Sequence, residues 1–271
     1  MATVRSVVPK QMLNPAGGYL TGYSHTLNPY AGCSFACSYC YVRRMPVALF
    51  RQEEWGTWVD VKEQAAMQLR RDLAKAKRKG PVTIFMSSAT DPYQPEEAKA
   101  GVTRSLLEAM RDDPPEFLFV QTRSPLVTRD AELFAAFGER IRVSVTIETD
   151  RDDVRRAFSP SAPPIAARLK ALRELREAGI PTQAAVSPVL PSTEAFADAL
   201  AAVTGRVCVD DFFMGDGSGG KRTQALGIRG IFERLNRESW YGRDAYATVL
   251  ERMRDRFGDS QVFVSQAGFL P

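Results

Sequence analysis

Short apolar stretches alternate with longer stretches of helical period along almost the whole chain. The apolar stretches predict strands near residues 23–28, 82–88, 117–122, 141–148, 182–187 and 207–212. The periodic stretches predict helices at roughly 62–79, 97–112, 128–137, 164–178, 193–203 and 229–257. Because a helix follows each strand, the pattern predicts six β–α units.

The helix predicted over 164–178 carries the clearest end signals. Gly179 stands where a left-handed C-cap belongs, Pro164 stands at a first-turn position, and Gly80 is expected to cap the 62–79 helix in the same way as Gly179. Strands that are apolar on both faces and separated by helices pair in parallel with right-handed crossovers. The fold class is therefore α/β, with an open doubly wound sheet or a barrel, and six units are too few for a complete (β/α)₈ barrel.

Composition adds limits to this picture. The chain has 271 residues, of which 44% are hydrophobic and 25% charged, as is typical of soluble globular proteins. It lacks an apolar run long enough to span a membrane, and its first residues, MATVRSVVPK, lack the apolar stretch of a secretory signal. We therefore expect a cytoplasmic protein without a membrane partner.

The charge is nearly balanced, with a net value of +4. This excess is too small to indicate a polyanionic partner by itself. The densest basic run, Lys75 to Lys79, is either a phosphate-facing patch or the C-terminal end of a helix, and the second interpretation is favoured because cations stabilise that end. Two polar stretches interrupt the β–α pattern: 213–224 is expected to be a flexible loop or lid, and 149–163 a βα loop that is either functional or merely connecting.

The segment 28–41, NPYAGCSFACSYCY, holds the most informative motif of the chain. Cys33, Cys37 and Cys40 have the spacing C-x₃-C-x₂-C directly after the first predicted strand, whereas Cys208 lies far along the chain and His25 is the sole histidine. A structural zinc site uses four closed ligands, so three cysteines fit zinc badly. Cysteine thiolates also hold iron–sulfur clusters, and three of them leave one iron of a [4Fe–4S] cluster open.

This motif, with Tyr39 as the aromatic residue before the last cysteine, resembles the signature of the radical S-adenosylmethionine superfamily. The resemblance implies a partial (β/α)₆ barrel with a C-terminal helical extension. It also implies a [4Fe–4S] cluster on the three cysteines, with S-adenosylmethionine on the open iron. A reductant such as flavodoxin or ferredoxin then allows reductive cleavage of S-adenosylmethionine to a 5′-deoxyadenosyl radical, which abstracts hydrogen from the substrate. We expect an N-terminal extension over 1–20, the barrel over 21–212, and a glycine-rich loop with a C-terminal helix and strand over 213–271.

The words TLNPYAGCSFACSYCYVRR, SSATDPYQPEE, TRSPLVTRD and AGIPTQAAVSPVLP resemble the branch of this superfamily that is related to spore photoproduct lyase. That resemblance covers about residues 20–190. It makes a nucleic acid the first-choice substrate. The enzymatic rival is radical modification of a peptide or a small metabolite, and the rival without catalysis is a zinc-binding or electron-transfer module.

Polar side chains follow the predicted strands at the ends where parallel barrels open onto their active sites. Hydroxyls and a carboxylate can accept hydrogen bonds from the ammonium of S-adenosylmethionine, and a guanidinium can bind its carboxylate. The resemblance adds contacts to the ribose from the fourth strand. The candidate cofactor contacts are Tyr39, Ser87, Ser88, Asp91, Arg123, Ser124, Ser144, Thr146, Glu148 and Ser187.

Each candidate also has a purely structural interpretation. Ser87, Ser88 and Asp91 are residue types that build turns and helix caps, and the structural alternative for Arg123 is a surface ion pair with Asp130. Glu148 is favoured as a functional residue because an uncompensated carboxylate at a barrel mouth is seldom only structural.

One position departs from spore photoproduct lyase. The resemblance to that branch implies a hydrogen-donating cysteine directly before the serine of the second strand. This chain has Met86 at that position. Cys208 lies between Val207 and Val209 and is expected to be a small buried residue rather than a substitute donor. Tyrosines are candidates for radical relay, base stacking or simple packing: Tyr23, Tyr30, Tyr41 and Tyr93.

Overall fold

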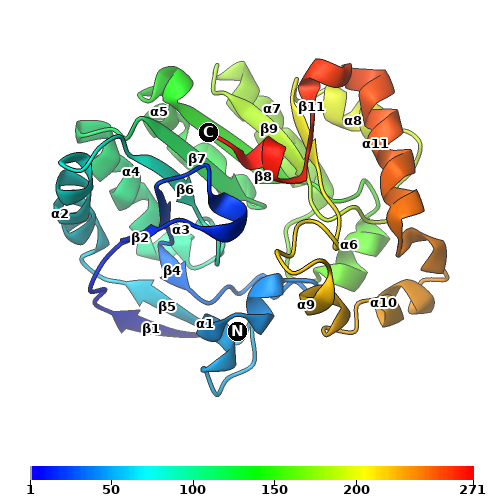
Figure 1. Cartoon of the computed structure of the whole chain (residues 1–271), viewed down its shortest axis with the longest axis horizontal. Coiled ribbons are helices and arrows are strands. Elements are labelled where there is room, and N and C mark those ends of the chain that lie inside the picture. Colours follow the sequence, from blue (N-terminus) through cyan, green and yellow to red (C-terminus); the bar gives the residue numbers. More distant parts are fainter. Residues whose placement is uncertain (1) are drawn as a thin grey trace.

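The computed structural model describes residues 2–271, and parallel strands form its centre (Figure 1). Within these residues the main sheet has eight strands in the order β11 (Val262–Val264), β10 (Val207–Val209), β9 (Thr182–Val186), β8 (Ile141–Thr146), β7 (Phe117–Thr122), β6 (Thr83–Met86), β3 (His25–Leu27) and β2 (Leu13–Pro15). All neighbours pair in parallel except β2 and β3, which are antiparallel. The six predicted strands are confirmed as one parallel run from β3 to β10.

Most of these strands end earlier than the apolar pattern predicted. The stretch 207–212 leaves the sheet after Val209 because the carboxylate of Asp211 accepts hydrogen bonds from the backbone nitrogens of Phe213 at 2.7 Å and Met214 at 2.6 Å. The strands predicted at 23–28, 82–88, 141–148 and 182–187 are also shorter than expected. The polar residues that follow these strands form turns and do not extend the sheet. Their side chains therefore lie at the carboxyl ends of the strands.

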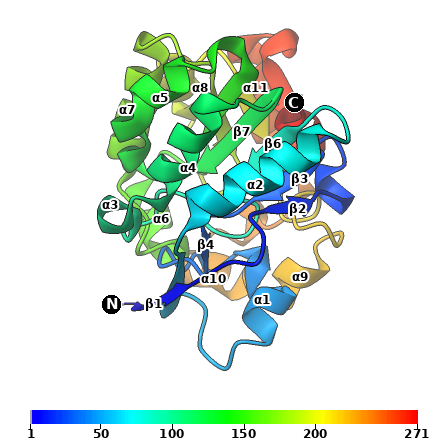
Figure 2. The same ribbon diagram turned by 90° about the vertical axis from the view of Figure 1, so that its left-hand side faces the viewer.

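Helices cover the outer face of the sheet (Figures 1 and 2). They are α2 (Ala65–Lys77), α4 (Val102–Asp112), α5 (Ala131–Ala135), α7 (Ile165–Glu177), α8 (Phe196–Ala201) and α11 (Arg243–Phe257). The helix α2 packs beside α4, and α11 packs beside α8. Among the residues that the structure describes, no helix combines the length and the apolar character needed to cross a membrane.

Several predicted helices are interrupted. Gly101, at φ +63°, separates α3 (Glu97–Ala100) from α4. The stretch 128–137 begins as the 3₁₀ helix η3 (Pro125–Asp130), and 229–257 divides into α10 (Arg229–Arg234), the 3₁₀ helix η5 (Glu238–Trp240) and α11. Asn236, at φ +54°, prevents α10 from continuing, because a residue in the left-handed conformation cannot extend an α-helix.

The predicted helix ends are partly confirmed. Gly179, at φ +74°, directly follows the C-cap of α7. Pro164 is the residue before α7 rather than part of its first turn. Gly80 lies two residues beyond the C-cap of α2 at φ +145°, so it does not form the predicted left-handed cap. The basic run does lie at the end of α2, where Lys77 pairs with Asp113.

The two irregular stretches contain structure of their own. The short helix α6 (Asp152–Phe158) lies within 149–163, and α9 (Lys221–Gln224) lies at the end of 213–224. In the second stretch the carboxylate of Asp216 accepts hydrogen bonds from the backbone nitrogens of Ser218 and Gly220, both within 2.9 Å. The glycine-rich segment is therefore folded around a single carboxylate.

A second, smaller sheet carries the chain into the cysteine motif. Its order is β1 (Thr3–Val7), β5 (Trp58–Lys62) and β4 (Tyr30–Ala31), and the sequence did not predict it because β1 is exposed along its length and β4 is very short. After β4 the chain turns at Gly32, at φ +81°, where a Cβ atom would collide with the ring of Trp58. The 3₁₀ helix η2 (Tyr41–Arg44) and α1 (Pro46–Leu49) follow the motif.

Segments from the two ends of the chain meet between the sheet edges formed by β2 and β11. They are the 3₁₀ helices η1 (Gly18–Leu20) and η7 (Ser265–Phe269). Elsewhere in the chain lie two other 3₁₀ helices, η4 (Gly138–Arg140) and η6 (Asp259–Gln261). The amide of Gln266 donates to the carbonyl oxygen of Tyr19 at 2.7 Å. The predicted division at residues 20 and 212 stays a prediction, although β2 and β11, which lie outside 21–212, both pair with the main sheet.

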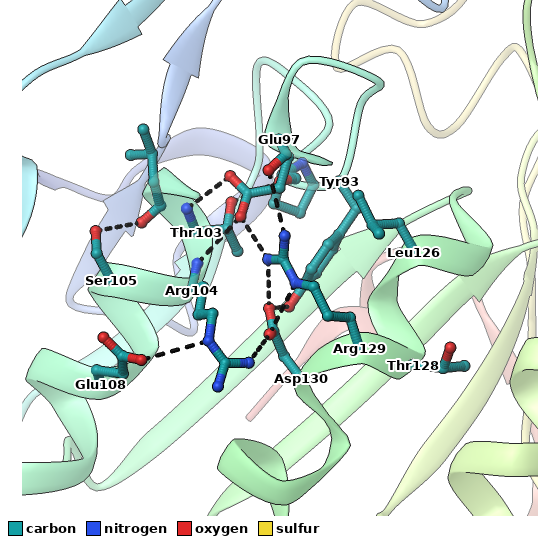
Figure 3. A network of polar contacts seen from close by, with 12 residues as sticks. Tyr93, Glu97, Thr103, Arg104, Ser105, Glu108, Leu126, Thr128, Arg129 and Asp130 are labelled. Carbon is teal, nitrogen blue, oxygen red and sulfur yellow. Dashed lines mark hydrogen bonds and ion pairs between the residues drawn. The ribbon is translucent and has the colours of Figure 1, made fainter. Parts of the chain in front are cut away.

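Figure 3 shows a buried ionic network around Glu97, Arg129 and Asp130. The carboxylates of Glu97 and Asp130 are fully buried, and one nitrogen of Arg129 binds them at 2.6 Å and 2.8 Å. Arg104 adds a second contact to Asp130 at 2.7 Å, and the hydroxyl of Tyr30 donates to Glu97. The network therefore attaches the strand before the cysteine motif to α3 and η3.

Replacing Arg129 by Ala should lower the free energy of unfolding by about 3 kcal/mol, because breaking a buried pair leaves a carboxylate without its cation. Urea denaturation measures this loss. The matched control is Arg111→Ala, since Arg111 pairs with Asp112 on the surface, and its effect should stay within about 0.5 kcal/mol. Equal stability of the two variants would contradict a structural role for the network.

Candidate active site

A cavity of about 580 Å³ lies at the carboxyl ends of the parallel strands. Residues in or directly after each strand of the parallel run from β3 to β10 line it: Thr26, Phe85, Gln121, Thr146, Ser187 and Asp210. A flat sheet cannot place all its strands around one cavity, so the sheet is curved into a partial barrel, as predicted. Parallel barrels carry their active sites at this end.

The three cysteines of the motif open onto this cavity. Cys33 and Cys37 are buried, Cys40 is partly exposed, and all three are free thiols in its wall. Across residues 2–271 no three His, Cys, Asp or Glu side chains converge tightly enough to hold a single metal ion. Cys208 is fully buried away from the cavity, with its sulfur 3.5 Å from the carbonyl oxygen of Ser265, which confirms the prediction of a core position.

Hydrogen bonds hold the cysteine loop on both sides. The backbone nitrogen of Ser34 donates to the side chain of Gln94 at 2.9 Å, and its hydroxyl donates to Glu96 at 2.7 Å. On the other side, Ser38 donates to the carbonyl oxygen of Phe158 at 2.9 Å from its backbone and at 2.8 Å from its side chain. The loop therefore has a fixed position relative to the barrel.

The surroundings of the thiols bear on whether they can hold an iron–sulfur cluster. Burial raises the pKa of Cys33 well above its usual value, with Asp91 adding to the effect, and burial with Cys37 raises the pKa of Cys40 to about 11. Thiolates at these positions therefore need positive charge beside them, which metal ions provide. Three thiols in one wall, with His25 outside the cavity lining, fit a group that takes three protein ligands.

Tyr39 joins the cysteine loop to the barrel through Glu148. The hydroxyl of Tyr39 donates to the carboxylate of Glu148, and Arg123 donates to the same carboxylate at 2.6 Å and to the Tyr39 hydroxyl at 2.8 Å. Arg168 binds the other oxygen of Glu148 at 2.7 Å. This arrangement links four elements: the loop, the end of β7, the end of β8 and α7.

Two guanidiniums therefore compensate Glu148, and the prediction of an uncompensated carboxylate is wrong. Burial alone would raise the pKa of Glu148, but Arg168 and Arg123 lower it to about 2. Arg123 does not pair with Asp130, whose partners are Arg104 and Arg129. Within the guanidinium of Arg123, only Nη1 makes hydrogen bonds to the described residues, so the other nitrogens of that group can donate into the cavity.

Ser87 has the features of a ligand contact. It adopts φ +76°, which is strained for a residue other than glycine, and its buried hydroxyl has no hydrogen-bond partner within residues 2–271. Ser88 accepts from Asn28 at 3.3 Å, and both serines line the cavity. Asp91 also lines it, but its oxygens accept from Thr122 and from two backbone nitrogens, as the turn interpretation expected.

The remaining candidates divide between the cavity and its support. Thr146 and Ser187 line the cavity, and Thr146 accepts a hydrogen bond from Gln121 at 2.6 Å. Ser124 and Ser144 are outside the lining, because Ser124 caps η3 through the backbone nitrogen of Leu126 and Ser144 lies fully buried. Cofactor contact by the lining residues stays a prediction.

Among the tyrosines, only Tyr41 of the predicted set lines the cavity, and its hydroxyl donates to the carbonyl oxygen of Ser88. Tyr30 and Tyr93 bind the buried carboxylates of Glu97 and Asp130. Tyr23 packs among core aromatic rings.

Among the polar residues of the site that sequence reasoning missed are Tyr19, Arg168, Asp210 and Arg222. The predicted strand at 207–212 concealed Asp210, although a carboxylate directly after an apolar run was a usable signal. Arg168 lay inside a helical pattern, where an arginine predicts a solvated face. Met86 is fully buried outside the lining, and the three motif cysteines are the only thiols in the wall formed by the described residues.

Comparisons with known sequences agree with this arrangement. A family model described as the Radical SAM superfamily matches residues 27–201. Uncharacterized protein MJ0683 of Methanocaldococcus jannaschii is 35% identical over 182 residues, which are 67% of this chain and 66% of that protein. Uncharacterized protein ORF301 of Acidianus two-tailed virus is 32% identical over 172 residues, 61% of this chain and 56% of that protein. The chain thus matches 56% to 66% of the length of these relatives.

Solved structures share the fold. Spore photoproduct lyase complexed with dinucleoside spore photoproduct superposes with a TM-score of 0.66 and 15% identity, covering 97% of this chain and 81% of that one. Streptococcus suis SuiB bound to the precursor peptide SuiA gives a TM-score of 0.51 and 15% identity, covering 78% and 46%. The match of the family model to most of the barrel, together with the three-cysteine cavity, shows that this chain belongs to the radical S-adenosylmethionine superfamily, with a fold like that of spore photoproduct lyase.

Proposed function

We propose that this protein is a radical S-adenosylmethionine enzyme that modifies a nucleic acid. The observation that carries the proposal is the common cavity: three cysteines, with no further cysteine or histidine in the wall formed by residues 2–271, open onto the carboxyl ends of the parallel strands. A zinc-binding module would not need a cavity of this size beside its cysteines. The rival without catalysis is therefore disfavoured.

In this proposal Cys33, Cys37 and Cys40 hold a [4Fe–4S] cluster. When bound, the cluster would supply the electron for reductive cleavage of S-adenosylmethionine into methionine and a 5′-deoxyadenosyl radical, the species that would abstract hydrogen from the substrate. The reductant is a small electron carrier such as flavodoxin or ferredoxin. The buried wall of the cavity excludes water from the reacting groups.

The polar residues of the wall bind the cofactor. Ser87 can accept from its ammonium, because that hydroxyl lacks a protein partner, and Arg123 can donate to its carboxylate. Tyr39 and Glu148 act as positioning residues, since both hold the Arg123 guanidinium. Ser88, Asp91, Thr146 and Ser187 complete the wall.

Two observations favour a nucleic acid over a peptide. The spore photoproduct lyase that shares this fold is complexed with a dinucleoside, and its superposition covers 97% of this chain. The cavity also contains Arg222, which forms no ion pair with the described residues and can meet a phosphate, as well as aromatic rings that can stack on bases.

Anaerobically reconstituted protein should bind about four iron and four sulfide per chain. Replacing Cys33, Cys37 or Cys40 by Ala should abolish the cluster and its brown absorbance, because each supplies one of three ligands. Metal analysis and absorbance spectra measure this. The control Cys208→Ala should keep both, since that thiol lies outside the cavity. One equivalent of zinc without iron uptake would refute the enzyme.

Replacing Arg123 by Ala should weaken binding of S-adenosylmethionine by about 1.5–3 kcal/mol, the value of a hydrogen bond to a charged group. Calorimetry on the reconstituted protein measures the change, and iron content should stay at the wild-type level. Arg140→Ala is the matched control because Arg140 is exposed at the opposite end of β8. Unchanged affinity of the Arg123 variant would restrict this side chain to its structural ion pair.

With reductant and S-adenosylmethionine, formation of 5′-deoxyadenosine should rise when damaged DNA or RNA is added and not when peptides are added. We expect little reversal of the spore photoproduct, because Met86 lies where the lyase has its donor cysteine and Cys208 is buried. Chromatography of nucleosides measures both outcomes. A rise with peptides alone would replace the nucleic-acid proposal, and efficient repair that is lost in Cys208→Ala would show that this thiol donates hydrogen.

A further inference from the structure

Asp210 places a carboxyl group in the cavity wall at the other end of the parallel run from the cysteine loop. The residue is 1% exposed. One oxygen accepts from the hydroxyl of Tyr19 at 2.8 Å, and the other accepts from the backbone nitrogen of Asp211 at 2.9 Å. Each carboxylate oxygen can accept about two hydrogen bonds, so acceptor capacity remains on both.

Three other buried aspartates of the cavity wall, Asp91, Asp211 and Asp216, each accept hydrogen bonds from at least two backbone nitrogens, whereas Asp210 accepts from only one. Glu148, Glu97 and Asp130 each bind at least one guanidinium. Within residues 2–271 Asp210 forms no ion pair with lysine or arginine. Burial consequently raises its pKa to about 7. A buried carboxyl without a cation is costly to keep, so its place in a cavity indicates that a ligand completes its hydrogen bonds.

Aromatic rings continue the wall beside this carboxyl. The ring centroids of Tyr19 and Phe269 are 6.1 Å apart, and those of Phe269 and Phe85 are 6.4 Å apart. All three residues line the cavity together with Asp210. This wall offers a flat ligand apolar faces for stacking and, at one edge, an acceptor of hydrogen bonds.

Three distant parts of the chain build the site. The Tyr19 hydroxyl lies 3.1 Å from the hydroxyl of Ser265, and Ser265 adopts φ +51°, a strained conformation of the kind that clusters at functional sites. The glycine-rich segment packs against the carboxyl, since a Cβ atom on Gly215 would collide with Asp210. The same segment brings Arg222 to the cavity. A carboxyl group without a cation, aromatic rings and the guanidinium of Arg222 thus line the same cavity.

We propose that Asp210, oriented by Tyr19, accepts a hydrogen bond from the N–H edge of a nucleobase that packs against the rings of Phe85 and Phe269. A peptide ammonium would bind the carboxylate but has no flat surface to pack against the rings, whereas an unpaired base offers both an N–H edge and a flat face. This inference rests on the proposed nucleic-acid function and identifies where the base is recognised. Arg222 is placed to meet the phosphate of the same nucleotide.

The test uses reconstituted protein with S-adenosylmethionine and fluorescein-labelled single-stranded homopolymers of dT, dC, dA and dG, together with an abasic strand. Fluorescence anisotropy gives the affinity for each. Asp210→Asn turns one acceptor into a donor, so binding of the preferred homopolymer should weaken about tenfold and the order of preference should change. Tyr19→Phe should shift the order in the same direction. The abasic strand should bind all variants alike.

Asp198→Asn is the matched control, because Asp198 is an exposed residue of α8 paired with Arg256, and it should leave affinities and order unchanged. Iron content and thermal unfolding verify that each variant is folded. Wild-type affinities and order in Asp210→Asn, or equal weakening for every homopolymer and the abasic strand, would overturn the inference alone. Failure of the wild type to bind any strand would overturn the proposed function and this inference with it.

Discussion

The shape of the cavity depends on the ion pairs and the hydrogen bond that the carboxylate of Glu148 accepts. Three side chains from separate elements meet there: Tyr39 from the cysteine loop, Arg123 from the end of β7 and Arg168 from α7. Breaking a buried ion pair leaves an uncompensated charge, so separating these elements would be strongly destabilising. The cysteine loop thereby keeps a fixed position relative to the strand ends that line the cavity.

The same principle operates behind the loop. Glu97 and Asp130 share Arg129, and Tyr30 and Tyr93 donate their hydroxyls to these two carboxylates. Carboxylates neutralised by arginines therefore hold the loop on both sides. The cavity, in contrast, contains polar groups that can still form hydrogen bonds or ion pairs. The Ser87 hydroxyl lacks a partner within residues 2–271, and the Asp210 carboxyl lacks a cation there.

The partial barrel is completed by the ends of the chain rather than by further β–α units. The 3₁₀ helices η1 and η7 meet between the edge strands β2 and β11, with Gln266 bound to Tyr19. This junction puts Tyr19 and Phe269 in the cavity wall. The cavity wall around Asp210 is therefore built mainly from segments outside the residues matched by the family model, 27–201, although Phe85 lies within them.

The sequence by itself determined the parallel run of six strands, the helix at α7 and the loop that holds the three cysteines. These features depend on local periodicity and spacing, which a single sequence displays directly. Helix interruptions at Gly101 and Asn236 were not predicted, because the apolar period continues across both residues. Only the tertiary structure decided which charges are paired, since Glu148 and Arg168 are 20 residues apart and Tyr19 and Asp210 are 191 apart. Partners at such separations leave no periodic signal, so the compensated role of Glu148 and the unpaired state of Asp210 emerge only when the barrel brings them together.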